Sequence, residues 1–103
     1  MKRYVWYVGV DMYLLMDMKE DKPVGSILPQ KEGSCIIRWG HHVKEEPMHE
    51  ELIDPPKYTD DPFDVIMYAA GAIEAKLWIS NDHDSIALID HVCRLREEER
   101  RAW

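Results

Sequence analysis

The apolar residues between positions 61 and 79 recur at steps of three and four, which is the spacing of one face of an α-helix. The residues of this series are Phe63, Ile66, Met67, Ala70, Ile73 and Leu77. Only Glu74 and Lys76 are charged between residues 65 and 79. Because so little of its surface is polar, the pattern predicts a core helix that is buried on more than one side.

Three residues predict where this helix begins. Asp61 stands at the cap position, where its carboxylate can accept a hydrogen bond from a free backbone amide. Pro62 then takes the first helical position, where its missing N–H costs nothing. Asp64 adds a negative charge to the first turn, which suits the positive end of the helix dipole.

The N-terminal part of the chain follows a period of two instead. Residues 3–18 are rich in aromatic and β-branched side chains and predict two strands or one long bent strand. Residues 27–28 are expected to form a short edge strand that ends at Pro29. Residues 34–43 predict a second clear strand.

Both faces of the first strands are apolar. On this alternation, the side chains of the second face are Val5, Tyr7, Tyr13 and Leu15. An antiparallel sheet that carries helices on one face normally has polar residues on the other. We therefore expect the second face to be covered. We favour the partner subunit of a homodimer, with another bound partner or the following connection as alternatives.

That connection, residues 44–60, contains three prolines and few apolar residues. It predicts a mostly irregular acidic loop, with one short helical turn near residues 49–53. Between residues 44 and 64, eight acidic residues stand against two lysines, a net charge of −6 within a chain of net charge −7. The eight acidic residues are Glu45, Glu46, Glu50, Glu51, Asp54, Asp60, Asp61 and Asp64.

A second helix is predicted after the polar residues 80–85. Asn81 or Asp82 is expected to cap it, and Asp84 to add a negative charge to its first turn. Its apolar stripe consists of Ile86, Leu88, Ile89, Val92, Cys93 and Leu95. Only about three residues separate it from the core helix, so we expect the two to form a helical hairpin.

Together these elements predict one α+β domain over residues 1–103. A small antiparallel β-sheet of three or four strands occupies residues 1–43, the acidic loop residues 44–60, and the two-helix hairpin, packed on the sheet, residues 61–103. A hydrophobic content of 46% with 32% charged residues is typical of a globular protein.

The negative charge limits the partners. A net charge of −7 argues against direct binding to nucleic acid or to an anionic membrane. No stretch approaches the ~18 consecutive apolar residues that a membrane-spanning helix needs. We expect a soluble, cytoplasmic protein in which Cys35 and Cys93 are free thiols.

Metal-binding residue types cluster at one place in the sequence. The weak candidates for a metal site are His41, Glu46 and His49. Zinc or manganese would suit these ligands and would make the protein a metal-dependent hydrolase. Pro47 disfavours the regular helix that would bring Glu46 and His49 together, so we prefer solvated loop residues as the explanation.

No other pattern indicates catalysis. Helix capping explains Asp82 and Asp84, and the two cysteines lie within apolar runs, where thiols are inert. The five glycines are scattered singly and form no phosphate-binding loop. We expect no catalytic residues and no cofactor.

The leading hypothesis is a non-catalytic binding protein, a small inhibitor or regulator whose acidic surface engages a basic macromolecular partner. The candidate partner-binding residues are Glu45, Glu46, Glu50, Glu51, Asp54 and Trp103. Carboxylates spread along a surface can stand in for DNA phosphates, an analogy of class with small virus-encoded inhibitors.

The alternative hypothesis is a small-molecule binding or sequestering protein with a pocket at a dimer interface. A nucleotide-like ligand would stack on an aromatic side chain and place its phosphate near arginines. The candidate residues for this site are Tyr7, Arg38, Trp39, Trp78, Arg94 and Arg96.

Overall fold

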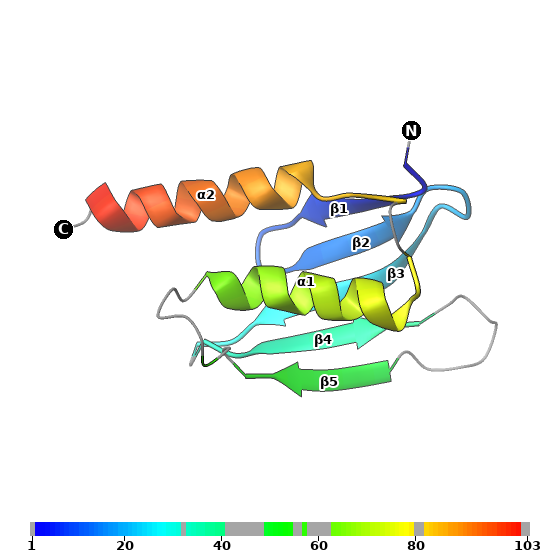
Figure 1. Cartoon of the computed structure of the whole chain (residues 1–103), viewed down its shortest axis with the longest axis horizontal. Coiled ribbons are helices and arrows are strands. Elements are labelled where there is room, and N and C mark those ends of the chain that lie inside the picture. The colour runs from blue at the N-terminus through cyan, green and yellow to red at the C-terminus, as the bar shows by residue number, and fades with distance from the viewer. Residues whose placement is uncertain are drawn as a thin grey trace.

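The computed structural model of the chain describes residues 2–31, 33–40, 49–54, 57, 63–79 and 82–101. Within them, a mixed six-stranded sheet carries two helices (Figure 1). The elements in chain order are β1 (Tyr4–Val8), β2 (Tyr13–Asp17), β3 (Lys22–Pro29), β4 (Cys35–Trp39), β5 (His49–Ile53), α1 (Asp64–Lys76), β6 (His83–Asp84) and α2 (Ile86–Arg101). The α+β class is confirmed, and the sheet is larger than the three or four strands expected.

The strand order in the sheet is β5-β4-β3-β2-β1-β6. The first five strands form an antiparallel meander, in which each strand pairs with the next one along the chain. β6 then adds to the free edge of β1 in parallel, and the backbone amide of Tyr4 donates to the carbonyl of Asp82 at 3.1 Å. β1 is therefore an interior strand, and β5 is the long strand at the edge.

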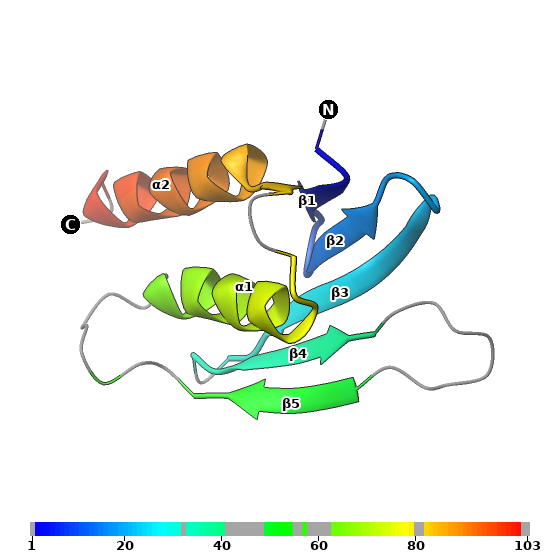
Figure 2. The same cartoon turned by 45° about the vertical axis from the view of Figure 1, so that its right-hand side comes forward.

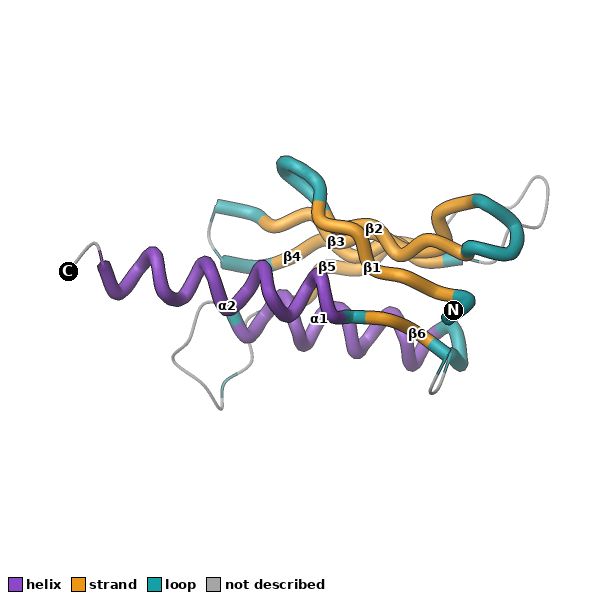
Figure 3. The backbone as a smooth tube through the Cα atoms, turned by 90° about the horizontal axis from the view of Figure 1, so that it is seen from above, coloured by secondary structure: helices purple, strands orange, loops and turns teal. Residues whose placement is uncertain are grey.

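Both helices lie on the same face of the sheet, and the described residues place no helix on the other face (Figure 3). α1 packs on β3 and β4, and α2 packs on β1 and runs in the opposite direction (Figure 2). The predicted two-helix hairpin needs correction, because β6 lies between the helices in sequence. The connection first returns to the sheet edge, so the two helices cover separate strands.

The core lies between the helices and the inner face of the sheet. Trp6 and Leu15 are completely buried there, and Tyr4 and Tyr13 are nearly so. Our assignment of Tyr13 and Leu15 to the second face was wrong. The connection from β1 to β2 pairs Trp6 with Leu15, and paired residues share a face, so Tyr13 and Leu15 point towards the helices.

A glycine lets α1 approach the sheet closely. A Cβ atom added to Gly25 of β3 would lie 2.8 Å from the Cγ2 atom of Ile73 on α1. Ile73 itself is fully buried. Any side chain at position 25 would push the helix away, because a core at native density has no room for an added methyl group.

Three further expectations about the strands need correction. Residues 49–53 form β5 and not a helical turn in an irregular loop, since they pair with β4 and bury Ile53. β3 covers residues 22–29 and lies inside the sheet, so it is neither short nor an edge strand. β4 ends at Trp39, and the rest of the strand predicted over residues 34–43 lies outside the described residues after Gly40.

The core helix is confirmed in the chain segment expected for it. α1 covers residues 64–76, and Phe63, the residue before it, makes no side-chain capping hydrogen bond. Asp61 and Pro62, the predicted start, lie outside the described residues. Neither of the two helices is long and apolar enough to cross a lipid bilayer.

Candidate functional site

The face of the sheet that carries no helix is mainly apolar. Strand alternation and register place the following side chains on it: Val5, Tyr7, Leu14, Met16, Leu28, Ile36 and Leu52. Tyr7 is 46% exposed and Leu52 56% exposed, and the other five are half-buried. The same register places Ser26, Arg38 and Glu50 in one row with Leu14 on this face, so the apolar residues lie on either side of a polar row. A solvated sheet face normally carries more polar residues than this one, which makes it a candidate binding surface.

Charged residues accompany this face at the β5 edge. The guanidinium Nε of Arg38 donates to the Glu50 carboxylate at 2.7 Å, and both side chains are about half exposed. Asp54, which follows β5, is also exposed. We call Ile36, Arg38, Glu50, Leu52 and Asp54 the β5 surface. Because the Arg38–Glu50 pair is so exposed, it contributes only about 0–1 kcal/mol and can rearrange easily.

Glu51 lies on the opposite face from Glu50. Its carboxylate forms an ion pair with Lys76 of α1 at 3.0 Å. The same lysine lies 4.5 Å above the ring of Trp39, which stacks on His49 with ring centroids 5.4 Å apart. This cluster ties the end of α1 to β4 and β5, so Glu51 has a structural role.

The predicted partner-binding residues are thus only partly brought together. Glu50 and Asp54 belong to the β5 surface, while Glu51 faces the helices. Glu45, Glu46 and Trp103 lie outside the described residues. Asp64, a further acid of the segment, forms an ion pair with Arg96 of α2.

The alternative nucleotide site is not assembled within the chain. Its six candidate residues lie in four different places. Tyr7 and Arg38 share the open face, with β2 and β3 between their strands, whereas Trp39 faces the helices. Trp78 is 90% exposed just after α1, Arg96 pairs with Asp64, and Arg94 is exposed on α2. The sequence could not show this separation, because strand register decides which face each residue occupies.

The weak metal candidates are also only partly described. His49 stacks on Trp39, as above, and His41 and Glu46 lie outside the described residues. Among the residues that the structure describes, no three of the types His, Cys, Asp and Glu lie close enough together to hold a metal ion.

Sequence reasoning missed a polar network beneath the helices. The buried indole of Trp6 donates to one carboxylate oxygen of Glu74 at 2.8 Å, and His83 Nε2 lies 3.3 Å from the other. His83 Nδ1 is buried and has no hydrogen-bond partner. The sequence does contain a hint of this network, because Glu74 is one of only two charged residues in the apolar stretch of residues 65–79. This network joins α1, β1 and β6 and holds β6 in place at its edge of the sheet.

A second charged group fixes the turn between β2 and β3. Asp17, 4% exposed, accepts two hydrogen bonds from the guanidinium of Arg3 at 3.0 and 2.9 Å and two more from the backbone amides of Lys19 and Glu20. The hydrogen bonds from Arg3 hold the pKa of the Asp17 carboxyl below its usual value, and those from the two amides add to the effect.

Comparison of the chain with protein-family models, with curated proteins and with solved structures finds no match. The β5 surface is therefore interpreted from its own residues. It combines an apolar patch, an exchangeable ion pair and an edge strand, which are features of a protein-binding surface.

Proposed function

We propose that the protein is a non-catalytic binding protein, an inhibitor or regulator that engages a basic macromolecular partner through the β5 surface. One observation carries the proposal. β5, the edge strand within the segment of net charge −6, presents Glu50 and Leu52 at the end of an open apolar face.

The chemistry of this surface favours a partner that contributes both cations and apolar groups. Leu52 and Ile36, paired across β5 and β4, offer an apolar contact, and the edge of β5 offers backbone groups for strand addition. Glu50 can exchange its contact with Arg38 for a partner's lysine or arginine. The rest of the acidic segment would speed the encounter with a basic surface.

Charge also favours such a partner over a second copy of the chain. Two chains of net charge −7 repel each other, whereas a basic partner is attracted over roughly one Debye length, about 8 Å in physiological salt. The homodimer predicted from the apolar strands is therefore the competing occupant of the same face.

The test uses a short peptide of alternating lysine and leucine as the probe, and the matched peptide of alternating glutamate and leucine as its control. Two-dimensional NMR of the ¹⁵N-labelled protein should show shifts that cluster on β4 and β5 with the lysine peptide alone. The variant Glu50→Lys should weaken binding about tenfold, because one favourable charge contact is replaced by repulsion. Leu52→Ser should also weaken it.

Glu98→Lys is the matched control, since Glu98 is exposed on α2, away from β5. Equal losses from Glu50→Lys and Glu98→Lys would contradict the proposal, because they would mean attraction by net charge alone. Sedimentation of the unbound protein tests the competing occupant. If the native protein sediments as a stable dimer and the Leu52→Ser variant as a monomer, the helix-free face of the sheet binds a second copy of the chain instead.

A further inference from the structure

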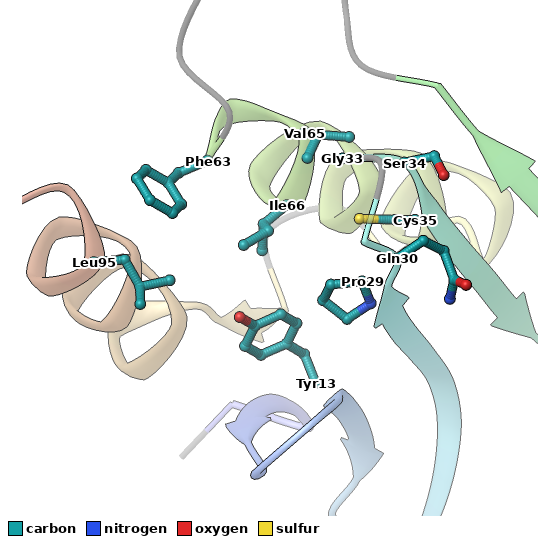
Figure 4. Close-up of a pocket in the computed structure, with 10 residues that line it drawn as sticks. All are labelled: Tyr13, Pro29, Gln30, Gly33, Ser34, Cys35, Phe63, Val65, Ile66 and Leu95. Atoms are coloured by element: carbon teal, nitrogen blue, oxygen red, sulfur yellow. The ribbon is translucent and has the colours of Figure 1, made fainter. Parts of the chain in front are cut away.

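The described residues surround a pocket of about 220 Å³ between the two helices, at the end of the molecule where α1 begins (Figure 4). Tyr13 and Cys35 rise from the sheet to form its floor. Phe63 and Ile66 line the α1 side, and Leu95 lines the α2 side. The pocket exists because α1 packs over β3 and β4 while α2 packs over β1, which leaves space above the start of β2.

The described residues that line the pocket carry no charge. None of its ten lining residues is Asp, Glu, Lys, Arg or His. Burial raises the pKa of the Cys35 thiol to about 11, and burial also raises the pKa of the Tyr13 hydroxyl, so both groups are neutral at physiological pH. A charged ligand would lose its hydration here without gaining a counter-charge from the lining, which is unfavourable.

Among the polar residues of the lining, Tyr13 presents its hydroxyl to the space between the two helices. The hydroxyl of Tyr13 lies 3.1 Å from Nε2 of His91 on α2, and it faces the space bounded by Ile66 and Leu95 (Figure 4). When the Tyr13 hydroxyl donates a hydrogen bond to the His91 imidazole, the phenolic oxygen still has a lone pair that can accept a second hydrogen bond. A ligand O–H or N–H would satisfy it.

The volume sets the size of the ligand. An apolar cavity of about 150 Å³ in a protein holds benzene, so the pocket between the helices has room for a slightly larger ring. We propose that it binds a neutral aromatic molecule of phenol or indole size that carries one hydrogen-bond donor. The ring would lie between Phe63 and Leu95, and the donor would meet the Tyr13 hydroxyl. This inference is independent of the β5 surface.

The experiment uses phenol, indole and toluene as probes and benzoate as the charged control. The three neutral probes should bind with a Kd of about 0.1–1 mM, the range expected for ligands of this size, and should raise the melting temperature. Benzoate should not. No rise with any neutral probe would overturn the proposal, as would an equal rise with benzoate.

Two variants locate the site. Tyr13→Phe should weaken phenol and indole about three- to tenfold, through loss of one hydrogen bond, and leave toluene unchanged. Leu95→Trp should abolish binding of all three by filling the pocket. Ile89→Trp is the control, because Ile89 lies at a wider, shallower hollow near His83. Loss of binding in Ile89→Trp with retention in Leu95→Trp would move the ligand to that hollow and refute the assignment.

A separate readout uses the thiol on the pocket floor. In a Cys93→Ser background, Cys35 is the single thiol of the chain. Saturating phenol should slow its alkylation by N-ethylmaleimide, and benzoate should not. An alkylation rate that phenol does not change would contradict binding against Cys35, even if Leu95→Trp did not fold.

Discussion

Replacing Glu74 should cost more than its place on a helix surface suggests. The Glu74→Leu change removes the only acceptor that the structure gives the indole N–H of Trp6, and Trp6 has no exposed surface. A buried donor left without a partner costs about 1–3 kcal/mol. We take about 2 kcal/mol as the expected loss. The contact between the Glu74 carboxylate and His83 is lost as well, but it is partly exposed to solvent and adds little.

This loss can be converted into a melting temperature. A domain of 103 residues unfolds with an entropy of about 2.1 cal/mol/K per residue, or about 0.2 kcal/mol/K in total. A loss of 2 kcal/mol therefore lowers Tm by about 9 °C. Glu74→Gln, whose amide oxygen can still accept from the indole, should lower Tm by less than half as much. Circular dichroism during heating and urea titration measures both variants.

A double-mutant cycle isolates the hydrogen bond itself. In a Trp6→Phe background no indole N–H exists, so Glu74→Leu should cost about 1–2 kcal/mol less than in the native chain. The residual cost then reports the contact with His83. Equal losses in the two backgrounds, or a Glu74→Leu variant as stable as the native protein, would refute the role given to this carboxylate.

Two other predictions concern ionisable groups. The pKa of Asp17 is lower in the folded state than its unfolded value of 3.8, so the unfolded chain takes up the proton first as the pH falls. The free energy of unfolding should therefore decline below about pH 4. The Asp17→Asn variant should be less stable than the native protein at neutral pH, and the difference in their free energies of unfolding should shrink in acid. Urea titrations at several pH values measure this difference, and a difference that does not change with pH would contradict the prediction. Cys93 is exposed on α2, so it should be alkylated far faster near neutral pH than the buried Cys35, whose pKa is about 11. Mass spectrometry of the modified chain measures the two rates, and equal rates would contradict the prediction.

The elements with strong local patterns could be predicted from the sequence. α1 was found because apolar residues cover nearly all of residues 64–76, which only a buried helix explains. β5 was missed because its local composition, two glutamates between nearby prolines, argues for a loop. Pairing with β4 and burial of Ile53 override that composition, and neither can be seen in the segment alone.

The candidate sites were harder to predict, because they depend on register and on distant pairs. A single step of register moved Tyr13 and Leu15 from the open face to the core. The pocket depends on helices that cover separate strands, and its Tyr13 hydroxyl contacts His91, which is 78 positions away in the sequence. No local pattern contains this information. The acidic segment can be recognised from the sequence alone. That Glu50 and Glu51 lie on opposite faces of the sheet follows only once residues 49–53 are known to form a strand.

The parallel pairing of β1 with β6 has a consequence for how the protein is made. His83 lies 79 positions after its neighbour Tyr4, so it is translated well after β1. Until then β1 has only β2 beside it, and its other edge exposes unpaired amides and carbonyls to any strand nearby. A nascent or prematurely terminated chain that lacks residues 82–84 therefore carries a second reactive edge at the N-terminal end of the sheet, which the finished protein closes with only two residues.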